Sequence, residues 1–173
     1  SKLMLCIAFL GVVNNFGYLL ELSAVNVNDA MKAVSVEYLG GAFIVSFVFL
    51  FAIEFCGMKM AKAIAYAIFS FDGIVLLSVC TYKFNPLFYS DTFFGMRGLI
   101  PHLSLQKGPL YIINAIKLCG MFFVQIVITI RTSFTTPETH KRASASQLAV
   151  CCGLPFMAFI INDSGVLNGY DPV

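Results

Sequence analysis

Residues 35–56 read SVEYLGGAFIVSFVFLFAIEFC, with Glu37 near the start of the run and Glu54 near its finish as the only charged side chains. A helix rises about 1.5 Å per residue, so about 20 apolar residues cross the ~30 Å hydrocarbon core of a bilayer. The run is continuously apolar and lacks the strict alternation typical of a barrel strand. It therefore predicts a transmembrane helix, and Gly40-Gly41 within it predicts close packing against another helix.

Four further runs of similar character occur at residues 3–22, 61–82, 110–130 and 147–166. Gly108-Pro109 introduces the run 110–130, and proline suits the first turn of a helix because its missing N–H would have no partner there. Pro155 predicts a kink in the last run. The sequence thus predicts an all-α, polytopic transmembrane helix bundle of about five spans, with an extended or partly helical connection over residues 83–109.

The composition of the whole chain supports the same class. Of its 173 residues, 59% are hydrophobic and 12% are charged, whereas an average soluble protein has roughly 25% charged residues. A soluble chain of this size would expose more apolar surface than one core can hide, but a bilayer accepts apolar surface on every side. The composition therefore excludes a soluble globular domain and makes the lipid bilayer the first expected partner.

The sequence contains no motif for catalysis, neither a phosphate-binding GxxxxGK[ST] loop nor an HExxH zinc motif. Its six cysteines lie in or at the ends of the runs without zinc-site spacing, and we expect them to pack as small apolar residues. His102 and His140 are expected on opposite sides of the membrane. We therefore expect no enzymatic activity in this chain, no metal, no cofactor and no nucleic-acid partner.

Lys and Arg near the ends of the spans predict the orientation, because cytoplasmic loops usually carry the excess. With alternating crossings, one side holds Lys2, Lys59, Lys62, Arg131, Lys141 and Arg142, and the other side holds Lys32, Lys83, Arg97 and Lys107 over longer loops. The chain is therefore predicted to start at the cytoplasmic face, with the 83–109 loop outside. The lack of an initiator methionine and the odd number of spans indicate a piece of a longer protein.

Two charged residues, Asp72 and Lys117, lie away from the ends of the predicted spans. A charge at the bilayer centre costs at least ~2.5–3.5 kcal/mol and is usually retained for a reason. Both residues lie at similar depths on consecutive antiparallel helices, so an ion pair is geometrically possible. The alternatives are that Lys117 extends toward the membrane surface and that Asp72 is protonated or bonded to a neighbouring hydroxyl.

A second set of polar residues lies on either side of the short connection between the first two predicted spans. Its members are Asn14, Asn15, Tyr18, Glu21 and Glu37. Together they would line an outward-facing cavity that binds a ligand, and because adjacent positions on a helix lie about 100° apart, at least one of the two amides should face protein. The alternative is that these residues anchor the helix ends and bond neighbouring backbone.

Several short motifs along the chain resemble, as an ordered set, the motifs of one family. They are Asn14-Asn15-Phe16-Gly17-Tyr18-Leu19-Leu20-Glu21, Val36-Glu37-Tyr38-Leu39-Gly40, Asn85-Pro86-Leu87-Phe88-Tyr89-Ser90, Gly108-Pro109-Leu110-Tyr111, and Leu154-Pro155 followed by Asn162. In order and spacing they are similar to the N-terminal seven-helix (7TM) sensor region of bacterial histidine kinases and diguanylate cyclases. The chain would then correspond to helices two to six of that region.

The resemblance implies a sensory input region in the bacterial cytoplasmic membrane. It would bind an unknown small-molecule or lipid-like ligand and regulate a cytoplasmic histidine kinase or diguanylate cyclase domain of a homodimeric parent protein. Helix two of the family starts at the cytoplasmic face, in agreement with the charge distribution. The alternative is a fragment of a secondary transporter with Asp72 as a coupling carboxylate, and a purely structural membrane subunit is a third possibility.

Overall fold

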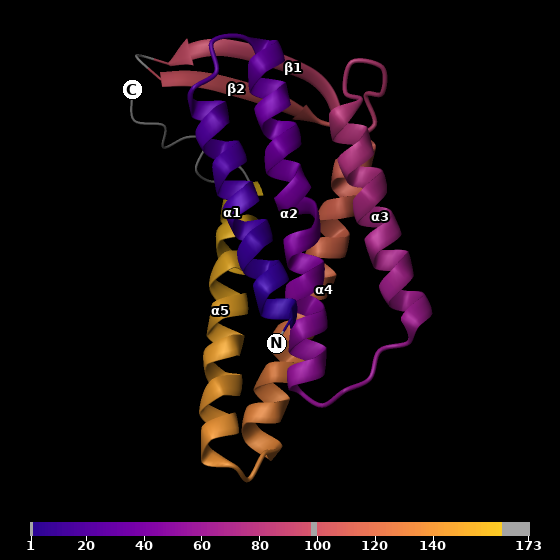
Figure 1. Ribbon diagram of the computed structural model, residues 1–173, viewed down its shortest axis with the longest axis vertical. Coiled ribbons are helices and arrows are strands. Elements are labelled where there is room, and N and C mark those ends of the chain that lie inside the picture. The colour runs from indigo at the N-terminus through magenta and orange to yellow at the C-terminus, as the bar shows by residue number, and fades with distance from the viewer. Residues whose placement is uncertain (1, 98–99, 164–173) are drawn as a thin grey trace. The chain divides into compact units, whose positions relative to one another are not determined.

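The computed structural model describes residues 2–97 and 100–163 (Figure 1). The described helices are α1 (Lys2–Leu22), α2 (Val27–Phe55), α3 (Lys62–Cys80), α4 (Pro109–Thr135) and α5 (Thr139–Asp163), and the strands are β1 (Tyr89–Arg97) and β2 (Ile100–Lys107). All five helices are long and apolar enough to cross a membrane. The predicted fold class, an all-α transmembrane bundle, is therefore confirmed, with a small β-hairpin added to it.

The chain divides into two compact units. The first consists of residues 1–48 and 60–116, and the second consists of residues 49–59 and 117–173. The first unit therefore contains α1, most of α2, all of α3, both strands and the start of α4, whereas the second contains the end of α2, most of α4 and α5.

Close antiparallel packing of α1 and α2 forms the frame of the first unit. A Cβ atom added to Gly17 would overlap the backbone of Glu37, and one added to Gly40 would lie 2.7 Å from the backbone nitrogen of Asn14. Glycine permits this approach because no side chain stands between the two backbones. The close packing predicted from Gly40-Gly41 is thus confirmed, and we call this contact the α1–α2 seam.

The second helix begins at Val27, earlier than the expected residue 35, because Asn26 caps it. The backbone N–H of Asp29 donates to Asn26 Oδ1 over 2.9 Å, and the Asn26 amide donates back to Asp29 Oδ2 over 2.7 Å. The first of these bonds satisfies one backbone N–H donor that the first turn of a helix would otherwise leave unpaired, and the second holds the Asn26 side chain in place. At 29 residues, α2 exceeds the length needed to cross a bilayer, so its polar first turns extend beyond the hydrocarbon core.

The fifth helix also starts earlier than expected, at Thr139 instead of residue 147, and it continues through Pro155. The last part of the fifth predicted run, from residue 164 onward, lies outside the described residues.

The 83–109 connection contains a regular antiparallel hairpin rather than the extended or partly helical loop expected from the sequence. Its register runs from Tyr89 opposite Lys107 to Arg97 opposite Ile100, with an irregularity between Tyr89 and Asp91. Leu103 and Leu105, two residues apart on β2, pack against the buried core of the first unit. Their period-2 spacing is the physical reason for a strand, since alternate residues of a strand share one face.

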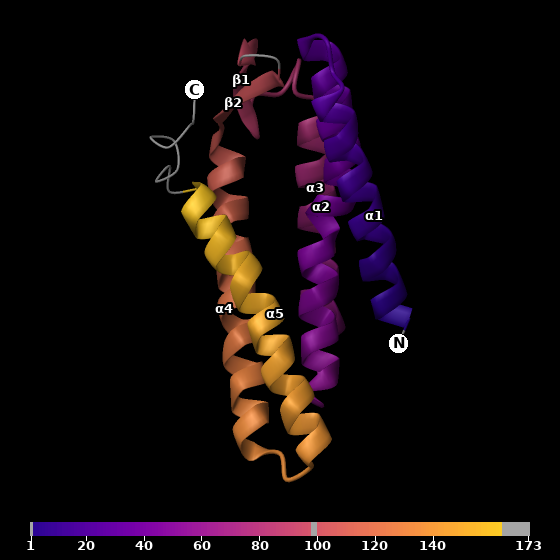
Figure 2. The same ribbon diagram turned by 90° about the vertical axis from the view of Figure 1, so that its left-hand side faces the viewer.

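The hairpin lies at the end of the first unit where α1 ends and α2 begins, as two perpendicular views show (Figures 1 and 2). We call this the hairpin end. The last turn of α3 reaches the same end. The hairpin therefore lies beside four helix ends of the first unit: the end of α1, the start of α2, the end of α3 and the start of α4.

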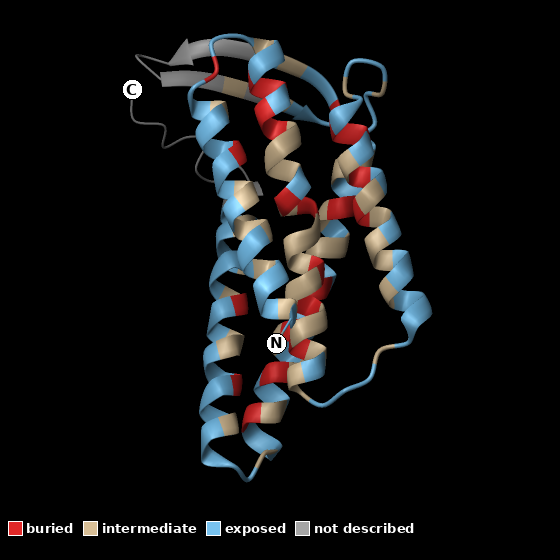
Figure 3. Cartoon of the chain, in the orientation of Figure 1, coloured by how far each residue is buried: buried red, intermediate tan, exposed pale blue. Residues whose placement is uncertain are grey.

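Exposed residues occur along all five helices (Figure 3), and many of them are large and apolar. Leu5 and Phe9 on α1 are 73% and 67% exposed, and Phe134 on α4 is 77% exposed. Soluble proteins rarely leave contiguous apolar surface of this kind in water. Contact with lipid accounts for it.

Candidate functional site

Glu21 and Glu37 meet at the α1–α2 seam. The backbone of Glu37 lies directly against Gly17, and Glu21 follows Gly17 by about one helical turn on the same face of α1. The two carboxyl groups are near enough to interact electrostatically and through a side-chain hydrogen bond. The structure thus brings together the two acidic residues that the sequence placed in one group, and we call them the carboxyl pair.

Asn14 also lies in the seam, one turn further from the hairpin end. A Cβ atom added to Gly41 would be 2.6 Å from Asn14 Oδ1. Asn15 and Tyr18 are instead exposed on α1, and Tyr18 is 51% exposed. Of the two adjacent amides, Asn14 is therefore the one that faces protein, and three of the five residues predicted to share a cavity lie along the seam.

Four aromatic side chains pack together beside the carboxyl pair, and we call them the aromatic cluster: Tyr38, Phe88, Tyr89 and Tyr111. Phe88 is fully buried at the centre, with its ring centroid 5.3 Å from Tyr38, 4.9 Å from Tyr89 and 5.4 Å from Tyr111. All three pairs are edge-on, the arrangement that the ring quadrupoles favour. The cluster joins α2, the start of β1 and the start of α4.

A hydrogen bond between two tyrosines crosses the cluster. Tyr89 Oη donates to Tyr38 Oη over 2.8 Å. Burial and, to a lesser extent, the neighbouring Tyr38 and Glu37 raise the pKa of Tyr89 well above its usual range. The phenol therefore stays protonated even in alkaline solution in which a free tyrosine would ionise, and it remains a donor.

The base of the hairpin holds Phe88 in place through backbone hydrogen bonds. The N–H of Gly108 donates to the carbonyl of Phe88 over 2.8 Å, and the N–H of Leu110 donates to the carbonyl of Leu87 over 2.8 Å. A Cβ atom on Gly108 would lie 2.7 Å from the carbonyl oxygen of Pro86, so only glycine fits between the two segments. The two motifs 85–90 and 108–111 are thus joined to each other at the base of the hairpin.

The chain matches a known protein family over its whole length. The family described as the N-terminal 7TM region of histidine kinase matches residues 1–173. The chain belongs to this family. No curated protein and no solved structure matches it.

Membership of this family confirms the resemblance to the 7TM sensor region of histidine kinases and, with the five apolar helices, supports a multi-pass membrane protein. The family is a membrane-embedded sensory region rather than a catalytic domain. The motifs that carried the resemblance have a structural reason in this chain, because three of them supply the aromatic cluster. Tyr38, Tyr89 and Tyr111 were not among the predicted site residues, although each lies within one of these motifs.

Asp72 is fully buried in this 7TM chain and accepts a hydrogen bond of 2.5 Å from the hydroxyl of Ser46, which is also fully buried. The bond joins α3 to α2 within the first unit. A neighbouring hydroxyl was one of the alternatives for Asp72, and the structure shows it. Lys117 belongs to the second unit, and its pairing with Asp72 stays a prediction.

The second unit is held by hydrogen bonds at the end of α4. Arg142 Nε donates to the carbonyl of Ser133 over 3.0 Å, which ties α5 to α4. Cys56 Sγ donates to the carbonyl of Ile128 over 3.7 Å. All six cysteines are free thiols, and within the described residues no three His, Cys, Asp or Glu side chains gather as a metal site would require.

Proposed function

We propose that this chain is the ligand-sensing input of a bacterial signalling receptor, and that it regulates a cytoplasmic histidine kinase carried by the same, homodimeric protein. The observation that carries the proposal is the carboxyl pair, in which acidic groups from two helices meet at a seam with no side chain between the backbones. A diguanylate cyclase is the alternative output. The ligand would be a small or lipid-like molecule that brings hydrogen-bond donors to the two carboxyl groups.

A sensor needs a part of the structure that alternates between two conformations, and here that part is the α1–α2 seam, where the two helices shift relative to each other. A ligand shifts a conformational equilibrium only by its differential affinity for the two states. A ligand held by Glu21 on α1 and Glu37 on α2 senses the relative position of the helices, because its contacts depend on both. Tyr38 follows Glu37 directly and is bonded to Tyr89, so a shift of α2 also acts on the hairpin.

For the orientation, we propose a cytoplasmic start and a hairpin end outside the bacterial inner membrane, as the Lys and Arg distribution favours. Ser90→Cys, in a chain whose native cysteines are replaced, is expected to react with a membrane-impermeant maleimide in intact spheroplasts. Ser90 is exposed on β1. The control Lys59→Cys should react only after permeabilisation, and the reverse pattern would overturn the orientation.

The sensing role predicts a change in kinase output when the carboxyl pair is altered. Glu37→Gln and Glu21→Gln, each in the full-length receptor reconstituted in nanodiscs, should shift basal autophosphorylation in the same direction. We expect a change of about fivefold, the lower end of typical allosteric coupling. The double variant should change the output little more than either single one, because both remove the same interaction.

Glu54→Gln is the matched control, since Glu54 is exposed near the other end of α2, and it should leave the output unchanged. Unaltered autophosphorylation in both seam variants, with normal expression and insertion, would return the pair to a helix-anchoring role. Proton-coupled uptake of a solute by the intact protein, lost in Asp72→Asn, would instead favour the transporter alternative.

A further inference from the structure

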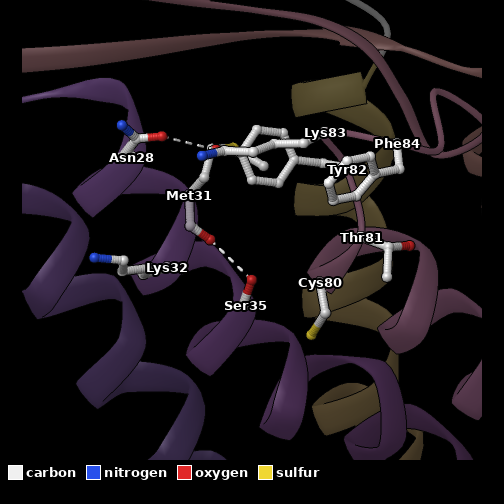
Figure 4. Close-up of a pocket in the computed structure, with 9 residues that line it drawn as sticks. All are labelled: Asn28, Met31, Lys32, Ser35, Cys80, Thr81, Tyr82, Lys83 and Phe84. Atoms are coloured by element: carbon white, nitrogen blue, oxygen red, sulfur yellow. Dashed lines mark hydrogen bonds between the residues drawn. The ribbon is translucent and has the colours of Figure 1, made fainter.

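A cavity of about 340 Å³ opens at the hairpin end of the first unit, between the first turns of α2 and the segment that follows α3 (Figure 4). It is separate from the carboxyl pair, because it lies on the α3 side of α2. Tyr82 Oη donates to Asn28 Oδ1 over 3.3 Å. This bond joins the two walls of the cavity.

The inner wall of the cavity is apolar. Met31 is fully buried and belongs to the same core as Phe88 and Tyr89, while Cys80 and Phe84 complete the apolar lining. Phe84 is 91% exposed, so apolar surface continues from the cavity to the outside. A ligand with a polar head and an apolar remainder suits these walls.

The charge of the lining is positive. Lys32 and Lys83 are its charged residues, and none of the residues that line it is acidic. Lys32 Nζ lies 3.5 Å from Asp29 Oδ1 and points away from the cavity (Figure 4). Lys83 has no ion pair with any described residue, and its ammonium lies 5.9 Å from the centroid of the Tyr82 ring, within cation–π range.

The position of the cavity fits the surface of a membrane. Its α2 wall belongs to the polar first turns, which extend beyond the length needed to cross the hydrocarbon core. Its other wall begins where α3 ends, at Cys80. Phosphate groups of lipids occupy this layer, and a lysine ammonium group, with three N–H donors, is suited to bind them.

We propose that this cavity binds an anionic phosphate group, either the headgroup of an anionic phospholipid or a free phosphate ion. Lys83 contacts the phosphate oxygens, Asn28 and Tyr82 border the headgroup, and in the lipid case the acyl chain leaves along Phe84. The site goes beyond the proposed sensory function and does not depend on it, because it is tested by binding to this chain and not by kinase output.

Native mass spectrometry of the purified chain with equal amounts of dioleoyl phosphatidylglycerol and dioleoyl phosphatidylcholine tests the site. The chain should retain phosphatidylglycerol in preference. Lys83→Gln should weaken that binding about fivefold, the effect of one lysine charge near an anionic lipid surface. Lys62→Gln is the matched control, because Lys62 is exposed at the opposite end of α3, and it should leave the binding unchanged.

Titration with sodium phosphate against sodium chloride at equal ionic strength distinguishes the two sources. Displacement of the lipid by phosphate, weakened in Lys83→Gln, would show that the site also takes the free ion, and lipid binding without displacement would assign it to the headgroup. Equal losses in Lys62→Gln and Lys83→Gln would overturn the proposal in favour of unspecific charge attraction. Absence of both lipid preference and phosphate binding would overturn it as well.

Discussion

Replacing Phe88 by alanine is expected to destabilise the hairpin end by about 3–5 kcal/mol, the usual cost of deleting a buried phenylalanine ring. Phe88 is fully buried, and three aromatic rings pack edge-on around it. The chain contains no tryptophan, so its near-ultraviolet circular dichroism arises mainly from tyrosine and phenylalanine. Loss of that signal at lower temperature than in the native chain, in detergent, would measure the effect.

Phe84→Ala is the matched control for this prediction. It removes the same ring from the same loop, but Phe84 is 91% exposed, so we expect a change within about 0.5 kcal/mol. If the two variants unfold at the same temperature, the aromatic cluster does not stabilise the hairpin end. Because the seam lies beside the cluster, Phe88→Ala should also change basal kinase output in the full-length receptor.

The helices of this chain were predictable because five apolar runs of about 20 residues in so short a chain are typical of membrane spans. The hairpin was not predicted, since Leu103 and Leu105 provide only a short alternation within a long connection. The hairpin is also joined to α2 by a contact far apart in sequence, the hydrogen bond from Tyr89 to Tyr38. Contacts between residues far apart in sequence produce no periodic sequence pattern, so they cannot be predicted from one.

The candidate site was predictable in part for a related reason. A short turn joins α1 to α2, so Glu21 and Glu37 had to lie near the same end of the bundle. Whether Asn14 or Asn15 faces protein depends on the rotation of α1 about its axis, and the seam glycines decide it. Gly40-Gly41 was a visible signal of close packing, but the partner segment on α1 is not encoded by any spacing in the sequence.

Gly17→Ala and Gly40→Ala are expected to destabilise the first unit by about 1–3 kcal/mol each, as overpacking usually does. The added Cβ atom would overlap the backbone of Glu37 in the first variant and would crowd the backbone nitrogen of Asn14 in the second. Backbone atoms cannot rotate out of the way as a flexible side chain can, so α1 and α2 must separate. Unfolding by sodium dodecyl sulfate in mixed micelles measures the loss.

Gly73→Ala provides the control, since Gly73 lies within α3 and a Cβ atom there would meet nothing within 4 Å. Alanine favours a helix over glycine by up to about 1 kcal/mol, so this variant should be neutral or stabilised. The sign of the effect on stability therefore distinguishes the seam glycines from a glycine with open space around it.

Because Gly17 fixes the distance between α1 and Glu37, Gly17→Ala should also alter kinase output in the full-length receptor, whereas Gly73→Ala should not. Equal stability of all three variants would show that the two helices do not pack closely in the membrane, and the carboxyl pair would then lose the contact that brings its members together.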